Sequence, residues 1–128
     1  MPNNVVQKKM PEEMRQGISK LKCKFVEELD NRILDFEAAL SEFRQGQNGL
    51  KAANLIRLQS HNVSGLASSL GFSEIGFSAA EAELSWDEAI KGNLSPELTC
   101  LADAATEKLL DVLESTLEPI SSHSISSG

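Results

Sequence analysis

The sequence predicts an all-α protein: an antiparallel up-down four-helix bundle with an N-terminal helical extension. Three observations lead to this fold class. Leucine, alanine, glutamate and serine dominate the composition and tyrosine is absent, which favours helices over strands. Apolar residues recur at every third or fourth position through most of the chain, as one face of a helix requires. Short loops separate these segments, and short loops make successive helices antiparallel neighbours.

The length of the chain indicates a single domain. A chain of 128 residues is sufficient for one hydrophobic core and short for two. We expect the helical bundle to span residues 11–119. Residues 1–10 are polar and lack periodicity, and residues 120–128 are rich in serine. We therefore expect a mobile start and a disordered tail.

The first helical segment begins at Pro11, because proline is well suited to the first turn of a helix. Its apolar positions continue with helical spacing as far as Phe43. We expect a break near Gly17, after which Ser19 is the N-cap of a longer second helix. The two glycines within residues 45–49 then end that helix and form the first loop.

Three further helices are expected, over residues 50–70, 73–91 and 96–119. Gly71 is suited to ending the first of them as a C-terminal cap. Trp86 lies on the apolar face of the second, where its large side chain is expected to anchor the core. Ser95 precedes a proline and an acidic residue, which is a strong N-terminal signal for the last helix, and Pro119 ends it.

The charge of the chain excludes one class of partner. The formal net charge is −7, whereas nucleic-acid binding depends on clustered lysine and arginine. The charge is also uneven: residues 1–24 carry a net charge of +4, so the remainder carries −11. The basic start is either a solvated terminus or a docking feature.

The sequence also indicates the compartment. No stretch approaches the roughly 20 apolar residues that cross a membrane, and the N-terminus lacks a secretory signal pattern. Cys23 and Cys100 stand alone, without the spacing of a disulfide framework or a metal site. We therefore expect a soluble cytoplasmic protein, without membrane association, whose cysteines are buried or idle thiols.

The helix over residues 50–70 carries a single histidine, His61, on its polar face. Six other residues are expected on the same face: Asn54, Arg57, Leu58, Ser64, Gly65 and Ser68. The opposite face is expected to be buried and consists of Ala52, Leu55, Ile56, Val63, Leu66, Ala67 and Leu70. Gln59 falls near the centre of this apolar face, where a buried amide needs hydrogen-bond partners.

Gly65 lies one turn after His61 on the same face. A glycine inside a helix costs about 1 kcal/mol relative to alanine, so helix stability does not explain it. Without a side chain, this position leaves space beside the imidazole for the backbone of another protein. Tight packing inside the molecule is the alternative, and the position of Gly65 away from the apolar face disfavours it.

A lone exposed imidazole is suited to carrying a phosphoryl group. The neutral ring has a nitrogen lone pair that can attack phosphorus, and the reaction chiefly needs positioning and charge neutralisation. The chain has no glycine-rich nucleotide motif and no evident carboxylate cluster on the His61 face. His61 is therefore expected to be an acceptor and donor whose catalytic apparatus belongs to a partner.

The residues around His61 resemble the signature of histidine-containing phosphotransfer (HPt) domains, the carriers of two-component phosphorelays. The similar positions are His61, Val63, Gly65, Ala67, Leu70, Gly71 and Phe72. The flanking segments 25–37 and 71–75 are also similar to the family, so the resemblance covers roughly residues 20–118. It implies a four-helix bundle in which His61 exchanges phosphate with the aspartate of a response-regulator receiver domain or a hybrid histidine kinase.

The same resemblance implies that the chain has no kinase activity and no cofactor of its own, since Mg²⁺ belongs to the partner receiver. We expect a monomer whose docking face comprises His61 and its six neighbours. One position departs from the family: Ser64 replaces the usual lysine, which is thought to offset phosphate charge. Arg57, one turn before His61, is the expected substitute.

The sequence also leaves alternatives to phosphotransfer. An adaptor that binds a receiver or kinase without transferring phosphate would keep the same surface, and Ser64 favours this alternative. A metal site at His61 is disfavoured, because no aspartate or glutamate lies three or four residues away. Hydrolysis is disfavoured further, because no local set of histidine, acid and serine is indicated.

Overall fold

The computed structural model describes residues 11–117, and within this range the chain is all-helical, with five helices and no strand. The helices are α2 (Glu12–Glu27), α3 (Leu29–Arg44), α4 (Gly49–Ser69), α5 (Ser73–Lys91) and α6 (Pro96–Leu117). The all-α class predicted from the sequence is confirmed. The expected mobile start at 1–10 and the tail at 120–128 lie outside the described residues.

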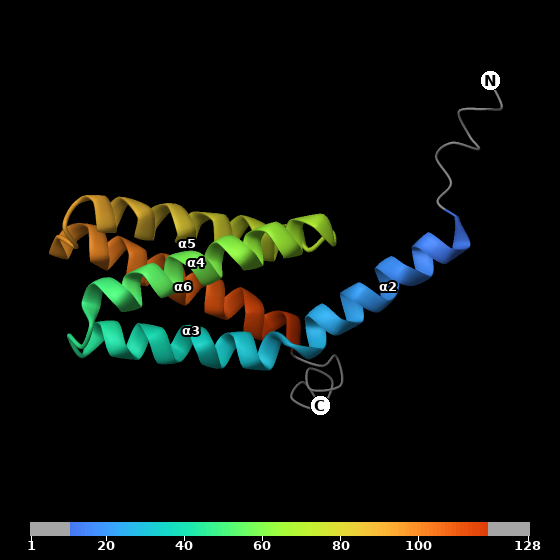
Figure 1. Cartoon of the computed structure of the whole chain (residues 1–128), viewed down its shortest axis with the longest axis horizontal. Helices are drawn as coiled ribbons and strands as arrows, with labels where there is room; N and C mark the ends of the chain where they lie inside the picture. The colour runs from blue at the N-terminus through green and yellow to red at the C-terminus, as the bar shows by residue number, and fades with distance from the viewer. Residues whose placement is uncertain (1–10, 118–128) are drawn as a thin grey trace, which may run out of the picture.

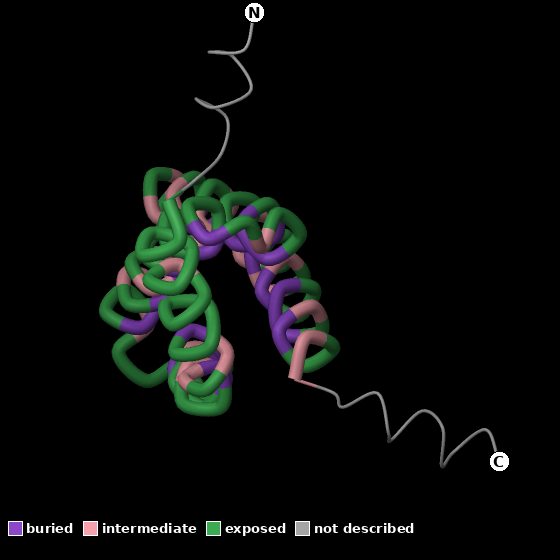
Figure 2. The backbone as a smooth tube through the Cα atoms, turned by 90° about the vertical axis from the view of Figure 1, so that its right-hand side faces the viewer, coloured by how far each residue is buried: buried purple, intermediate pink, exposed green. Residues whose placement is uncertain are grey.

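Helices α3 to α6 pack together as a bundle (Figure 1). Helix α4 packs along α5, α5 packs along α6, and α3 contacts both α4 and α6. Figure 2 shows that the buried residues lie on the sides that face one another. Helix α2 projects beyond the end of this bundle, and Phe25 is its single buried residue. The bundle therefore has one shared core, to which α2 contributes only its last turns.

Trp86 anchors this core, as its position on α5 predicted. Its side chain is fully buried and packs edge-on against Phe43, with ring centroids 4.9 Å apart. Its indole Nε1–H donates a 2.7 Å hydrogen bond to the Oγ1 of Thr106 on α6. That hydroxyl donates in turn to the carbonyl of Ala102 at 2.8 Å, so both buried polar groups are satisfied.

The break in the first helical segment lies at Glu28, so the predicted break near Gly17 is wrong. Gly17 and Ser19 lie inside α2, and Ser19 is not an N-cap. A mid-helix glycine costs only about 1 kcal/mol, which does not interrupt a helix by itself. The chain changes direction where Phe25 and Leu29 enter the core, because tertiary packing fixes the bend there.

The predicted caps at Gly71 and Ser95 are confirmed. Gly71 has a φ of +89°, which glycine adopts without strain. The N–H of Phe72 then bonds the carbonyl of Ala67 at 2.8 Å, which closes the end of α4. At the start of α6, the Oγ of Ser95 accepts a 3.4 Å hydrogen bond from the backbone N–H of Leu98. Local chemistry thus determines both boundaries.

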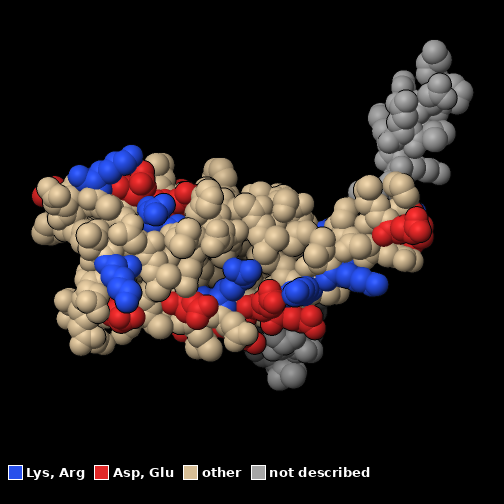
Figure 3. All heavy atoms as spheres, viewed as in Figure 1, with Lys and Arg blue, Asp and Glu red and all other residues tan. Residues whose placement is uncertain are grey.

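Charged side chains of both signs are interspersed on the surface shown in Figure 3. The strongest cluster joins α3 to α6, where Arg44 contacts Asp103 and Glu107. Hydrogen bonds to Asp103, and secondly to Glu107, raise the pKa of Arg44 above its ordinary value. None of the helices in residues 11–117 is both long enough and apolar enough to cross a membrane.

Candidate functional site

His61 lies near the middle of α4, and its side chain is 62% exposed. The helix is unbroken from Gly49 to Ser69, so residues three and four positions from His61 share its face. The small and polar residues of that face leave the ring open to solvent instead of enclosing it. The ring is therefore accessible to another molecule.

One side chain outside α4 contacts His61. The Nδ1 atom of the imidazole lies 2.8 Å from Oε2 of Glu83, which α5 contributes. The contact follows from the close packing of α4 on α5 two turns away, where Ser68 meets Gly76. A side chain at Gly76 would lie 2.4 Å from the Ser68 hydroxyl, so the glycine is what allows this approach.

The sequence reasoning missed Glu83. Sequence spacing relates His61 only to acids within one turn of the same helix, whereas Glu83 is 22 residues away on the next helix. A detectable signal existed, because Gly76 and Glu83 are seven residues apart and therefore share a face of α5. That face also borders the buried side of the helix, as a contact with α4 requires.

The Glu83 contact selects the state of the ring. A carboxylate accepts hydrogen bonds, so Nδ1 carries the proton and donates it to Glu83. In the neutral imidazole the lone pair is then on Nε2. The contact therefore favours one tautomer and one orientation of the ring, with Nε2 on the side away from Glu83.

Three of the predicted site residues precede His61 on α4. Arg57 is partly buried, and within residues 11–117 it makes no ion pair. Leu58 is about half exposed and is the apolar member of this face. Asn54 is partly buried, and its amide donates to the backbone carbonyl of Leu50 at 3.1 Å. Arg57 and Leu58 are thus available for contacts with a partner, whereas part of the Asn54 amide is occupied within the helix.

The other three predicted site residues follow His61 on α4. Ser64 is partly buried and Gly65 is exposed. A Cβ at Gly65 would meet no atom within 4 Å, so packing among the described residues does not require a glycine there. Ser68 is exposed but adjoins Gly76 of α5, which makes it part of the α4–α5 contact. The structure therefore has open space at Gly65, one turn from the imidazole.

The predicted apolar face of α4 needs correction. Leu55 and Leu66 are exposed, whereas Ser60 is fully buried. Helix α4 packs on α5 as well as on α3. The centre of its buried face is therefore shifted toward Ser60. Gln59 accordingly lies at the edge of the core and is only partly buried, although its Oε1 atom is buried without a hydrogen-bond partner among residues 11–117.

A cavity of about 30 Å³ lies beside Gln59. Arg32, Asp35, Phe36 and Val63 also line it, and the buried Nε of Arg32 likewise has no partner within the described range. The volume is that of about one water molecule, and the two atoms are a donor and an acceptor. Gln59 thus belongs to a small polar cluster at the core edge, apart from the His61 face.

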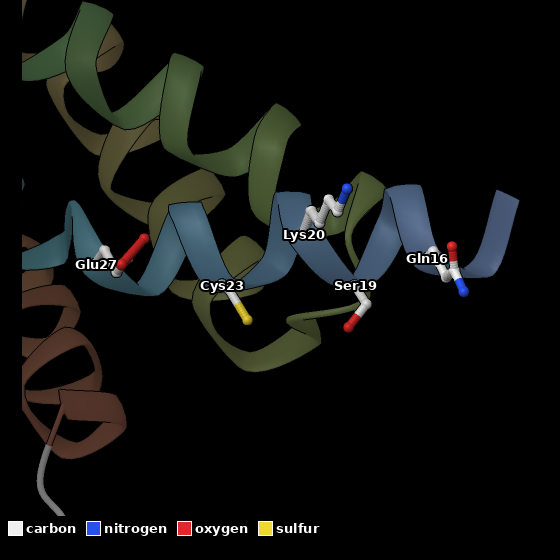
Figure 4. Close-up of a pocket in the computed structure, with 5 residues that line it drawn as sticks. All are labelled: Gln16, Ser19, Lys20, Cys23 and Glu27. Carbon is white, nitrogen blue, oxygen red and sulfur yellow. The ribbon is translucent and has the colours of Figure 1, made fainter. Parts of the chain in front are cut away.

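No rival site emerges from the described residues. Among residues 11–117 no three histidine, cysteine, aspartate or glutamate side chains gather to hold a metal ion. Cys23 and Cys100 are exposed and free, so the expectation that they are buried is wrong, and the alternative that they are idle stays a prediction. The hollow in Figure 4 is lined by residues of α2 alone: Gln16, Ser19, Lys20, Cys23 and Glu27. With lining from one helix, it does not enclose a small molecule.

Comparisons with known proteins do not assign the site. No family model, no curated protein and no solved structure matches the chain. The functional assignment therefore depends on the geometry of His61, Glu83 and the open face of α4.

Proposed function

We propose that this chain is a histidine phosphotransfer protein, in which His61 accepts a phosphoryl group from a receiver domain and donates it to another. The observation that carries the proposal is the exposed imidazole whose Nδ1 is bound by Glu83 at 2.8 Å. A solvated ring with one nitrogen fixed and the other free is the arrangement that a phosphoryl carrier needs.

In the forward step, the lone pair of Nε2 attacks the phosphorus of an aspartyl phosphate on the receiver. The new N–P bond forms as the bond from phosphorus to the aspartate oxygen breaks, and the aspartate leaves as a carboxylate. The ring retains its Nδ1 proton and becomes positively charged, and the carboxylate of Glu83 offsets that charge. The reverse step returns the phosphoryl group to a second aspartate.

Arg57 supplies the positive charge that the phosphoryl oxygens need. It lies one turn before His61, and no carboxylate among residues 11–117 neutralises it. In the resembled family, a lysine occupies the position at which this chain has Ser64. The guanidinium of Arg57 takes the role of that lysine. No charged residue lies between Arg57 and Glu74 in the sequence, so the approach to His61 along α4 is not obstructed by like charge.

The partner approaches over Leu58 and Gly65. Leu58 gives the face an apolar contact, and the open space at Gly65 lets a partner backbone come close to the ring. The chain is a carrier without kinase activity, and Mg²⁺ is supplied by the receiver. The proposal includes the antiparallel up-down arrangement of α3 to α6, which the three- and four-residue loops between these helices support.

The test is phosphoryl transfer from receiver domains of the source organism, each phosphorylated on its aspartate. We expect an acid-labile label on the native chain from at least one receiver and no label on the His61→Gln variant. Asn62→Ala, which alters the neighbouring exposed residue, is the matched control and retains the label. Phosphoramidate, which phosphorylates accessible imidazoles without a protein partner, separates the chemistry of His61 from the choice of receiver.

The second candidate is an adaptor that binds a receiver or kinase without transferring phosphate. Ser64 in place of the family lysine favours it, because the phosphoryl group then has one cation fewer beside it. Receiver binding that persists while no phosphate reaches His61 would select this function over phosphotransfer.

A further inference from the structure

Helix α5 exposes an apolar strip outside the His61 face. Phe77 is 76% exposed and Leu84 is 59% exposed, and the exposed Ala80 lies between them. These three residues, the α5 ridge, share one side of the helix. Nothing in residues 11–117 packs over them, although an exposed phenylalanine costs solubility without contributing to the core.

Carboxylates border the α5 ridge on both sides. Glu81 and Glu88 follow Phe77 and Leu84 by one turn, and Glu83 and Asp87 lie on the side toward α4. Two of the four contact lysines: Lys108 reaches Glu81 at 3.4 Å and Lys91 reaches Asp87 at 3.0 Å. Both pairs are exposed and therefore weak. The surface suits an apolar helix with basic flanks.

Helix α2 has these properties. Its residues Met14, Ile18 and Leu21 recur at helical spacing and form an apolar line, the α2 stripe, on one side of the helix. Met14 and Leu21 are more than half exposed. Arg15 and Lys22 lie beside Ile18 on one flank, and Lys24 lies beside Leu21 on the other.

The two surfaces also match in spacing. Met14 and Leu21 are seven residues apart on α2, and Phe77 and Leu84 are seven residues apart on α5. The flanking charges repeat the same interval, which separates Arg15 from Lys22 and Glu81 from Glu88. Seven residues span two helical turns, or about 10.5 Å, so apolar and charged pairs come into register together.

We propose that two copies of this chain associate through these surfaces, the α2 stripe of each copy packing on the α5 ridge of the other. A single chain does not make this contact, because α2 leads into α3 and its Leu21 borders Leu66 and Leu70 of α4. A two-fold pair makes the contact twice and covers both surfaces, which closes the assembly. This proposal of a dimer differs from the monomer expected from the sequence.

The native full chain is expected to show a concentration-dependent dimer by sedimentation equilibrium. Arg15→Glu/Lys22→Glu and Glu81→Lys/Glu88→Lys each make the facing helices repel, so we expect the apparent Kd of each variant to rise by about tenfold or more. An equimolar mixture of the two variants is expected to dimerise again, because each basic helix then faces an acidic one. Lys20→Glu, on the opposite side of α2, is the control and leaves the Kd unchanged.

A Phe77→Ser/Leu84→Ser variant, whose changes lie on the surface, is expected to remain folded by circular dichroism and to be monomeric. A native chain that stays monomeric up to about 1 mM overturns the proposal. So does a dimer that the mixed charge variants fail to restore, since another surface then holds it together. His61→Gln dimerises like the native chain, so the result is independent of the proposed phosphotransfer.

Discussion

Two of the polar contacts that helix α5 makes with its neighbours are similar in length and differ in exposure. Glu83 binds His61 of α4 at 2.8 Å, and Trp86 binds Thr106 of α6 at 2.7 Å. The His61 side chain is 62% exposed, whereas Trp86 and Thr106 are fully buried. The two hydrogen bonds are thus nearly equal in length but differ in their access to solvent.

The buried contact serves stability. Thr106 uses its hydroxyl both to accept from the indole and to donate to Ala102, so loss of this hydroxyl leaves the buried indole N–H without a partner. At the surface, water replaces Glu83 without such a cost. The contact between Glu83 and His61 thus contributes little to stability. In the proposed function, its role is to orient the ring.

The largest effect is expected at the buried contact. Trp86→Ala should lower the free energy of unfolding by about 4 kcal/mol, because it removes the central core side chain. Thr106→Val keeps the volume but removes the acceptor, and should cost about 1–2 kcal/mol. Urea unfolding followed by circular dichroism measures both. Equal stability of Trp86→Ala and the native chain would show that α5 does not depend on this contact.

The next largest effect is expected at the exposed contact between Glu83 and His61. It concerns the rate of phosphoryl transfer, not the stability of the fold. Glu83→Ala should slow transfer to His61 by about ten- to a hundredfold, because the Nδ1 proton loses its acceptor. Glu83→Gln retains an acceptor oxygen without the charge and should recover part of the rate. Single-turnover transfer from a phosphorylated receiver measures this, with Glu88→Ala as the control. If both alanine variants transfer equally fast, Glu83 does not orient the ring.

Substitutions of Arg57 test whether a positive charge beside the imidazole matters as much as the orientation of the imidazole. Arg57→Ala should slow transfer by about tenfold, which corresponds to roughly 1.4 kcal/mol in the transition state. Arg57→Lys keeps the charge and should retain most of the rate, and Lys51→Ala, further from His61 on the same helix, is the control. The measurement is again single-turnover transfer, and an unchanged rate for Arg57→Ala would remove it from the site.

The smallest expected change in stability is at Gly65, where two substitutions separate the access of a partner from the stability of the helix. Gly65→Ala should raise the free energy of unfolding by about 0.5–1 kcal/mol, because alanine favours the helix and meets no atom within 4 Å. Gly65→Arg should block partner approach and slow transfer, while its unfolding midpoint stays near that of the native chain. Normal transfer by the arginine variant would refute the role of this space.

Much of the fold was predictable because helix boundaries depend on neighbours in the sequence. Gly71 and Ser95 cap helices through hydrogen bonds to residues within five positions, so the residue types alone were sufficient. The break at Glu28 was not predictable, because the packing of Phe25 and Leu29 in the core determines it. Helix α4, which carries the predicted site residues, is present as expected. The function of these residues remains a prediction.

The sequence alone determined the all-helical class, the caps at Gly71 and Ser95 and the candidate histidine, since these depend on periodicity and local hydrogen bonding. Only the tertiary structure decided which side chain binds that histidine. Glu83 reaches His61 because two helices are rotated so that Ser68 meets Gly76, and that rotation is a property of packing. The same packing left the α5 ridge and the α2 stripe uncovered, because each helix has one buried side and the bundle fixes which side that is.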